Sequence, residues 1–337
     1  MNRGPIWILC ITCVLGACSN STQPPNPPGE LYTIIEGWPS WSPFGRYIVY
    51  NHEARDTLEL MRYGQFSIWA YDTQTDRVGF LVGPGMFAKW NPEGTILAFD
   101  WWWNLFFYYL DSRTVRQVTH GFDAIEFNWS PSGKSLIISP GDGILIDTLG
   151  NIYAHLIPWD RSNAGWLGGW DGDWFSENRI LIMSDDSLSR TGLPIIDTLG
   201  QIMDTVIIEE NPRFGFGYPS ISPDQSRIVT NYSFITPDGY SHGDFRLLTR
   251  EGILLTIISP DAGMGEWSPD GSKIVFQKYT WMADNPFPGD PDYGRVTPWI
   301  CNADGSDMHE LLGWPQPPPD TTMFGGGYNW LTDTHDP

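Results

Sequence analysis

The chain has 337 residues, of which 18% are charged and 15% are aromatic, including 18 Trp. Its 36 Gly and 28 Pro indicate frequent turns and few long helices. Lys and Arg number 19 against 40 Asp and Glu, which gives a formal net charge of −21. Because phosphate recognition needs a basic surface, this charge argues against a nucleic acid partner. The 41% hydrophobic content is enough for a large core and excludes wholesale disorder.

The N-terminal residues 1–17 have the layout of a signal peptide. Arg3 precedes an apolar stretch over 6–15 that is too short to span a bilayer as a helix. The sequence LGAC at 15–18 resembles the bacterial lipobox, in which the Cys is lipidated and becomes the first mature residue. An ordinary signal peptide that happens to contain Cys is the alternative. We therefore predict a lipoprotein, lipidated at Cys18, that meets the membrane through its lipid anchor only.

A tether follows the lipidated residue. Residues 18–29 contain four Pro and no apolar periodicity, which is typical of an extended linker. By resemblance to enterobacterial sorting, Ser19 rather than Asp after the Cys favours the outer membrane, facing the periplasm or the cell surface. The predicted location is thus the bacterial cell envelope. The remainder, 30–337, is predicted to be a single domain.

The four cysteines carry no predicted disulfide. Cys10 and Cys13 have a CxxC spacing, but both lie in the segment that the signal peptidase removes. The mature chain then keeps Cys18, modified by lipid, and Cys301. Its stability must therefore come from the hydrophobic core.

One pattern recurs along the mature chain: an apolar anchor, a Ser-Pro-acid-Gly-like turn, a basic residue and a β-rich run. Successive anchors are 49, 39, 45, 47 and 46 residues apart, a period typical of four-stranded propeller blades. The six copies begin at Trp41 (WSPFGRYIVY), Trp90 (WNPEGTILAF), Trp129 (WSPSGKSLII), Trp174 (WFSENRILIM), Ile221 (ISPDQSRIVT) and Trp267 (WSPDGSKIVF).

The residue types of the repeat explain its turn. Pro pre-sets φ at the first corner, and Gly permits the positive φ with which the chain reverses. The copies at Trp174 and Ile221 lack part of this pattern, so we expect looser first turns there. A second repeat, DTLGNI at 147–152 and DTLGQI at 197–202, predicts hairpins between the two outer strands of a blade.

The WSPDG-type unit resembles the TolB-like family of β-propeller repeats, which are WD40-like, and the likeness extends from Leu31 to Trp330. The resemblance implies an all-β propeller of four-stranded blades. Six complete units favour six blades. The partial strands at 31–36 and 328–331 either close the ring by pairing or form a reduced seventh blade. No role is carried over, because propellers host many unrelated activities.

A serine hydrolase motif is the first candidate for catalysis. Residues 239–243 match GxSxG around Ser241, but this motif works on a strand-to-helix elbow. No helix is predicted after Gly243. We therefore predict that Ser241 is dispensable, and we assign no catalytic residue.

Acidic groups are the candidates for a metal site. They could supply oxygen ligands to calcium, although none matches an EF-hand loop and solvated loop carboxylates are the alternative. The six His show no metal-ligating spacing. We assign no metal and no cofactor. The acidic groups are Asp171 with Asp173, Asp185 with Asp186, and Asp284 with Asp290 and Asp292.

Two aromatic clusters allow two interpretations. The run at 101–109 has aromatic side chains on both faces of any strand, and a second cluster lies among glycines near 166–170. Packing between blades is one interpretation, and a stacking surface for a sugar ring or a protein is the other. The candidate ligand-stacking residues are Trp101, Trp102, Trp103, Trp166 and Trp170.

Three functions remain open. The leading hypothesis is a non-enzymatic scaffold whose propeller face binds another envelope protein or a peptide. The second is a carbohydrate-binding propeller that uses exposed Trp, and the third is a hydrolase-like enzyme. Trp side chains converging with polar partners in a concave pocket would favour a sugar, whereas a broad apolar patch with a polar rim would favour a protein.

Overall fold

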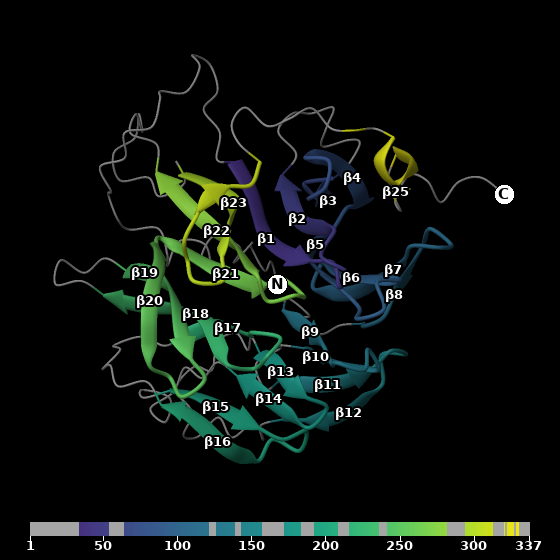
Figure 1. Ribbon diagram of the computed structural model, residues 1–337. Coiled ribbons are helices and arrows are strands. Elements are labelled where there is room, and N and C mark those ends of the chain that lie inside the picture. The colour runs from purple at the N-terminus through teal and green to yellow at the C-terminus, as the bar shows by residue number, and fades with distance from the viewer. Residues whose placement is uncertain are drawn as a thin grey trace, which may run out of the picture.

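The strands are arranged radially around a central axis, which makes the protein an all-β propeller, as the sequence predicts (Figure 1). One short 3-10 helix, η1 (Met323–Gly326), is the helical element of the described chain. Within that part, no helix has the length and apolar character needed to cross a membrane. The computed structural model describes residues 34–53, 64–120, 126–138, 143–156, 172–182, 192–207, 216–235, 241–281, 294–312, 320, 322–326 and 328–329.

The described strands form six units, each a meander of four antiparallel strands with its first strand nearest the axis (Figure 1). Units 1 to 3 are β1 (Ile34–Trp41), β2 (Tyr47–Glu53), β3 (Phe66–Asp72) and β4 (Arg77–Gly83); β5 (Met86–Trp90), β6 (Ile96–Trp101), β7 (Asn104–Tyr109) and β8 (Thr114–Gln117); and β9 (Phe127–Trp129), β10 (Ser135–Ile138), β11 (Ile144–Asp147) and β12 (Ile152–His155). Units 4 to 6 are β13 (Gly172–Ser176), β14 (Arg179–Ile182), β15 (Gly192–Ile196) and β16 (Ile202–Ile207); β17 (Phe216–Ile221), β18 (Arg227–Ile235), β19 (Ser241–Thr249) and β20 (Leu254–Pro260); and β21 (Ala262–Trp267), β22 (Lys273–Trp281), β23 (Gly294–Asn302) and β24 (His309–Glu310).

The ring closes by pairing of the first strand, one of the two alternatives, but with a partner, β23, that the sequence does not predict. The start of β1 runs parallel to β23, with Ile34 opposite Arg295, so units 6 and 1 share one nine-stranded sheet. In the described residues β25 (Tyr328–Asn329) pairs with β4 rather than with the N-terminal segment. The predicted class, a propeller of four-stranded units, is confirmed, but the count differs from six blades because the described strands form five sheets. The physical reason is that the start of β1 takes part of the open edge of β23.

The repeated turn has the bonding that its sequence predicts. In unit 1 the N–H of Ser42 donates to the carbonyl of Tyr47 at 2.8 Å, and the N–H of Gly45 donates to Ser42 at 2.9 Å. Gly45 has a φ of 72°, which L side chains rarely adopt. The same two bonds recur in units 2, 3 and 6.

The turns of units 4 and 5 are not looser than the others, so this expectation is wrong. Gln225 adopts a φ of 60°, and its N–H donates to the carbonyl of Ser222 at 2.7 Å. In unit 4 Ser176 pairs directly with Arg179, which leaves a two-residue turn. The chain thus reverses as tightly in units 4 and 5 as in the other units, although their turns lack the full Pro and Gly pattern.

The hairpins predicted from the second repeat are confirmed. Asp147 Oδ1 accepts hydrogen bonds from the N–H groups of Leu149 and Asn151, both at 2.9 Å, and the turn joins β11 to β12. Asp197 holds the turn between β15 and β16 in the same way.

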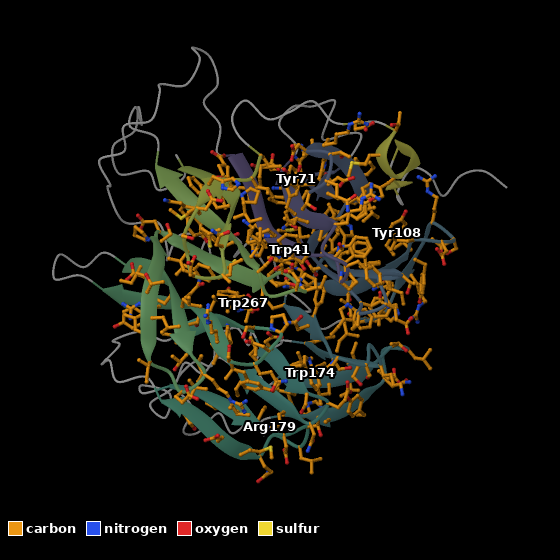
Figure 2. The ribbon with its side chains drawn as sticks, in the orientation of Figure 1. Trp41, Tyr71, Tyr108, Trp174, Arg179 and Trp267 are labelled. Carbon is orange, nitrogen blue, oxygen red and sulfur yellow. The ribbon has the colours of Figure 1, made fainter. Side chains whose placement is uncertain are left out.

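The hydrophobic core lies mainly between neighbouring units, because each sheet buries its faces against the next. The anchor tryptophans reinforce these contacts (Figure 2). In three units the indole N–H donates to a carbonyl on the inner strand of the preceding unit. These bonds join Trp129 to Lys89 at 3.2 Å, Trp174 to Asn128 at 3.3 Å and Trp267 to Ser220 at 3.2 Å.

The thiol of Cys301 belongs to this core. The residue is buried and free, and its burial raises the pKa to about 12. An un-ionised buried thiol is a poor nucleophile and metal ligand. Cys301 is therefore a packing residue.

Candidate functional site

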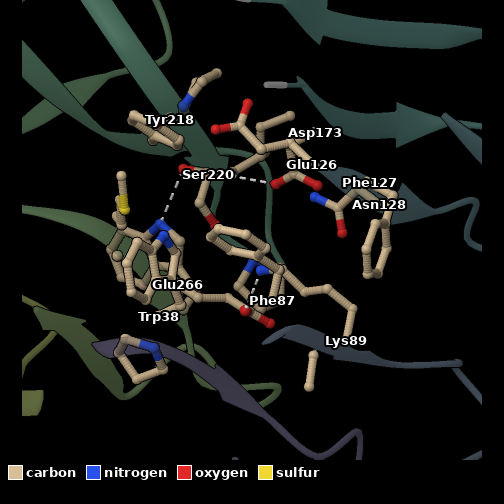
Figure 3. A pocket seen from close by; sticks show the side chains of 18 residues that line it. Trp38, Phe87, Lys89, Glu126, Phe127, Asn128, Asp173, Tyr218, Ser220 and Glu266 are labelled. Atoms are coloured by element: carbon tan, nitrogen blue, oxygen red, sulfur yellow. Dashed lines mark hydrogen bonds and ion pairs between the residues drawn. The ribbon is translucent and has the colours of Figure 1, made fainter. Parts of the chain in front are cut away.

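A cavity of about 250 Å³ lies where the inner strands of the propeller meet. Residues of β1, β5, β9, β13, β17 and β21, or beside them, line it, so every unit contributes (Figure 3). A concave site formed by several elements is the usual place for ligand binding. We call it the channel site.

The lining follows the register of the repeat. The positions one and three residues before the anchor recur in the lining from unit to unit. Position minus one contributes Lys89, Asn128, Asp173, Ser220 and Glu266, and position minus three contributes Trp38, Phe87, Glu126, Tyr218 and Met264.

Bulges in the inner strands present the large side chains of this lining. Trp38, Phe87, Tyr218 and Met264 have φ values of 53°, 54°, 51° and 51°. Each lies where the register shifts between the first and second strands of its unit. Positive φ is rare for bulky residues, and such backbone clusters at functional sites. The same rare backbone conformation therefore recurs at equivalent positions of four units, which indicates that the fold maintains the shape of the channel wall.

Side-chain amides from the preceding unit hold three of these bulges. Each amide oxygen accepts a hydrogen bond from the backbone N–H of the bulged residue. The bonds run from Trp38 to Gln277 at 3.0 Å, from Phe87 to Asn51 at 3.0 Å and from Met264 to Asn231 at 2.9 Å.

The approach of these amides depends on a glycine at one bulge. A Cβ at Gly263 would overlap the amide of Asn231. Gly263 therefore leaves the room that Asn231 needs to reach Met264. The backbone of the channel wall is in this way fixed before any ligand arrives.

An ion pair crosses the channel. Lys89 Nζ on β5 and Glu266 Oε2 on β21 lie 2.8 Å apart, although unit 1 separates their units in the ring. Both side chains keep about a quarter to a third of their surface exposed, at 30% and 26%. The bond thus links two units that are not adjacent in the ring and neutralises one acid of the wall.

Asp173 is a second carboxylate of the wall. Its Oδ2 accepts a hydrogen bond from the N–H of Ile221 at 2.7 Å, and its Oδ1 accepts one from the N–H of Trp174 at 2.8 Å. Burial raises the pKa of Asp173 to about 6, against the opposite effect of these two donors. Glu266 adds to the rise and Lys89 opposes it.

Glu126 is the third carboxylate. Burial raises its pKa, while a hydrogen bond from the Tyr218 hydroxyl and the charge of Lys89 act in the opposite direction. Its Oε2 is buried and has no hydrogen-bond partner among the described residues. The channel therefore combines aromatic walls with more negative than positive charge.

The predicted stacking residues lie elsewhere. Trp101 ends β6, and Trp102 and Trp103 form the turn to β7 with φ values of 52° and 63°. The Trp102 side chain is 67% exposed, and its indole meets that of Trp101 edge to face at 5.8 Å between centroids. None of the three lines the channel site. Their ligand-stacking role stays a prediction, and Trp166 and Trp170 lie outside the described residues.

The other sequence candidates are not brought together. Ser241 begins β19 and pairs with Ile235, so it lies on a strand and not on a strand-to-helix elbow. Of the acidic groups, Asp173 reaches the channel, whereas 171, 185–186 and 284–292 lie outside the described residues. Within the described ranges, no three His, Cys, Asp or Glu side chains are placed to hold a metal ion. The predicted lipidation site, Cys18, also lies outside them.

Apart from Asp173, the sequence predictions missed the channel residues, although a signal for them exists. The anchors define the register, and the residues one and three positions earlier include Lys, Asp and Glu next to Trp, Phe and Tyr. Reading those positions as columns of the repeat would have grouped Lys89, Asp173 and Glu266. The bulges and their amides have no comparable signal.

Fold and site together define a β-propeller with a charged, aromatic channel. No protein-family model matches the chain, and no curated protein sequence matches it. Among solved structures, an oligogalacturonate lyase in complex with manganese is 13% identical with a TM-score of 0.51, over 82% of this chain and 77% of the lyase. TolB from Acinetobacter baumannii is 18% identical with a TM-score of 0.41. That match covers 66% of this chain and 53% of TolB, so it spans about half of TolB. The lyase likeness shows the propeller fold alone.

Proposed function

We propose that the chain is a non-enzymatic scaffold of the bacterial cell envelope that binds a protein or peptide partner at the channel site. The observation that carries the proposal is the set of bulged aromatic and Met side chains in the wall. Aromatic residues and Met are enriched in the cores of protein interfaces. A backbone that is fixed before binding lowers the entropic cost of association.

The bonding of the bulges supports the same function. Trp38 and Phe87 lie edge to face with ring centroids 4.8 Å apart, so each ring restricts the other. The N–H groups of both residues are bound by amides of neighbouring units. Two rigid aromatic anchors in one cavity are the kind of residues that dominate binding energy when a partner side chain packs against them.

A carbohydrate is the second candidate, and the combination of a Trp with carboxylates in a concave site favours it. Sugar rings stack on aromatic faces while carboxylates accept bonds from their hydroxyls. The similar lyase is named for oligogalacturonate, which is a polyanion. Three carboxylates against one Lys in the described wall disfavour an anionic sugar, so a neutral one would be the ligand. An enzyme ranks third, because Ser241 lies on a strand.

Capture of the partner tests the proposal. Full-length lipoprotein is cross-linked in membranes, and captured proteins are compared between the wild type and Trp38→Ala. We expect one partner to be lost from Trp38→Ala and retained by Trp102→Ala, whose indole lies outside the channel site. Equal capture by all three proteins would contradict a channel interface. Saturable binding of a neutral oligosaccharide, lost in Trp38→Ala, would favour the second candidate.

Lipid attachment at Cys18 completes the proposal and rests on the LGAC sequence at 15–18. Replacing Cys18 by Ser should release the protein from membranes or trap the precursor. Membrane fractionation distinguishes these outcomes from unchanged attachment, which would contradict the lipoprotein assignment.

A further inference from the structure

We propose that the channel site binds one organic cation, the ammonium or guanidinium group of a Lys or Arg side chain or of an N-terminus. This inference rests on the proposed function, because the cation would be carried by the protein or peptide partner. It goes further by naming the chemical group that the channel recognises.

The first argument is the balance of charge in the wall. Three carboxylates and one ammonium group are present among the described lining residues. Lys89 lies 2.8 Å from Glu266 and neutralises it. Glu126 and Asp173 then have no cation of their own in the described wall. The ionised form of a carboxyl is costly in a narrow, poorly solvated site, and a ligand of opposite charge would favour that form in both groups.

The second argument is the state of Glu126. One of its oxygens accepts the Tyr218 hydroxyl hydrogen, while Oε2 is buried without a partner in the described part of the chain. Buried polar atoms are normally satisfied, and an exception calls for a missing partner. Figure 3 shows Glu126 in the wall of the cavity beside Asp173. A positively charged donor in the cavity is the partner that a carboxylate favours most.

The third argument is how firmly Asp173 is held. Its two oxygens accept backbone N–H groups of Ile221 and Trp174, which belong to neighbouring units. These neutral donors orient the carboxylate without cancelling its charge. The negative potential of the cavity is therefore directed by rigid strands rather than by a mobile side chain.

The fourth argument is the nature and size of the remaining wall. Trp38, Phe87 and Tyr218 place aromatic rings beside the carboxylates (Figure 3). Aromatic faces attract cations, and Trp does so best. The cavity volume of about 250 Å³ is below the usual range for larger ligands and suits a single side-chain group. An apolar group of that size would bury the carboxylates without compensating them.

The experiment compares two small probes on the full-length lipoprotein in detergent micelles. Calorimetry measures binding of Nα-acetyl-lysine methylamide and of the norleucine analogue, which has a similar length and no charge. We expect saturable binding of the lysine probe, at least about tenfold tighter than that of the norleucine probe.

Two substitutions of the wall should act in opposite directions. Glu126→Gln keeps the shape and removes the group that can ionise beside a bound cation. It should weaken binding of the lysine probe by about tenfold and leave binding of the norleucine probe unchanged. Lys89→Met removes the competing ammonium group and should strengthen binding of the lysine probe. The control is Glu251→Gln, an exposed residue outside the channel site, which should change neither affinity. Thermal unfolding verifies that each variant is folded.

The outcomes separate the inference from the proposed function. Equal affinity of the two probes, or no saturable binding, would overturn the inference while channel-dependent partner capture could still hold. Binding of the lysine probe without any Trp38-dependent capture would uphold the cation site and contradict the scaffold. If calcium chloride binds instead and displaces the lysine probe, the channel recognises a metal and the inference is wrong.

Discussion

Units 5 and 6 reach the same first turn with different residues. Unit 6 has Trp267 as its anchor and Gly271 at the positive φ of 70°, whereas unit 5 has Ile221 and Gln225. The indole of Trp267 donates to the carbonyl of Ser220 in unit 5. Ile221 has no such donor, so its link to unit 4 is formed differently.

Two bonds replace the missing indole. Asp173 of unit 4 accepts the N–H of Ile221 at 2.7 Å, and the Gln225 amide donates to the carbonyl of Phe175 at 2.8 Å. The exchange involves the candidate site, because Asp173 is also a carboxylate of the channel wall. The comparison shows that unit 5 departs from the repeat at Ile221, where its backbone bonds to Asp173 of the candidate site.

The largest difference in unfolding free energy between the two units should follow from replacing their anchors, Trp267 and Ile221, by Ala. Trp267 is 5% exposed, so Trp267→Ala should lower the free energy of unfolding by about 3–5 kcal/mol through the cavity and the lost bond. Ile221→Ala should cost about 1–2 kcal/mol, since Ile221 is only partly buried and its backbone bond to Asp173 survives. Urea-induced unfolding of both variants measures this. Equal losses would mean that the Trp anchor has no special weight.

The second prediction uses the carboxylate that substitutes for the indole. The folded pKa of Asp173, about 6, lies above the ordinary value of 3.8. Between these two pH values the folded state binds more protons than the unfolded state, so raising the pH lowers stability. The wild type should therefore lose up to about 3 kcal/mol relative to Asp173→Asn between pH 4 and pH 7. Unfolding free energies at several pH values measure the difference.

Asp224, also in unit 5, provides a control of opposite sign. Hydrogen bonds from Ser222 and Ser226 lower its pKa from 3.8 to about 2. The wild type should then lose stability relative to Asp224→Asn as the pH falls from 4 to 2. The same sign of pH dependence for both variants would refute the assignment of burial as the cause at Asp173.

The smallest effect concerns the turn of unit 5. Gln225→Gly and Gln225→Ala both lose the bond to Phe175, but only Gly relieves the positive φ. The glycine variant should therefore be about 1 kcal/mol more stable than the alanine variant. Thermal unfolding of the pair compares them directly. If alanine is the more stable, the left-handed backbone of Gln225 stores no strain.

Much of the fold could be predicted because its signals are local. The Ser-Pro-x-Gly turn at Ser42 and the Asp147 hairpin satisfy their own hydrogen bonds within a few residues. Turns of this kind fix strand ends wherever they occur in the chain. The fusion of units 6 and 1 escaped prediction because Ile34 and Arg295 are far apart in sequence. No local pattern specifies which edge the first strand will find.

The candidate site divides in the same way. Position in the repeat could have identified Asp173 and Glu266 as equivalent residues of the channel wall, since each directly precedes an anchor. The pairing of Glu266 with Lys89 depends on the diameter and closure of the ring. The exposed hairpin at Trp102 and Trp103 also escaped prediction, because type I′ turns normally take Asn or Gly there.

By itself, the sequence determined the all-β propeller and the local geometry of its turns. It did so because the repeat combines a buried apolar anchor with turn residues whose backbone preferences act over a few bonds. Only the tertiary structure decided the ring closure, the bulges held by Gln277 and Asn231, and the gathering of Glu126, Asp173 and Lys89. These features join residues of different units, and their energies exist only after the strands have packed around one axis.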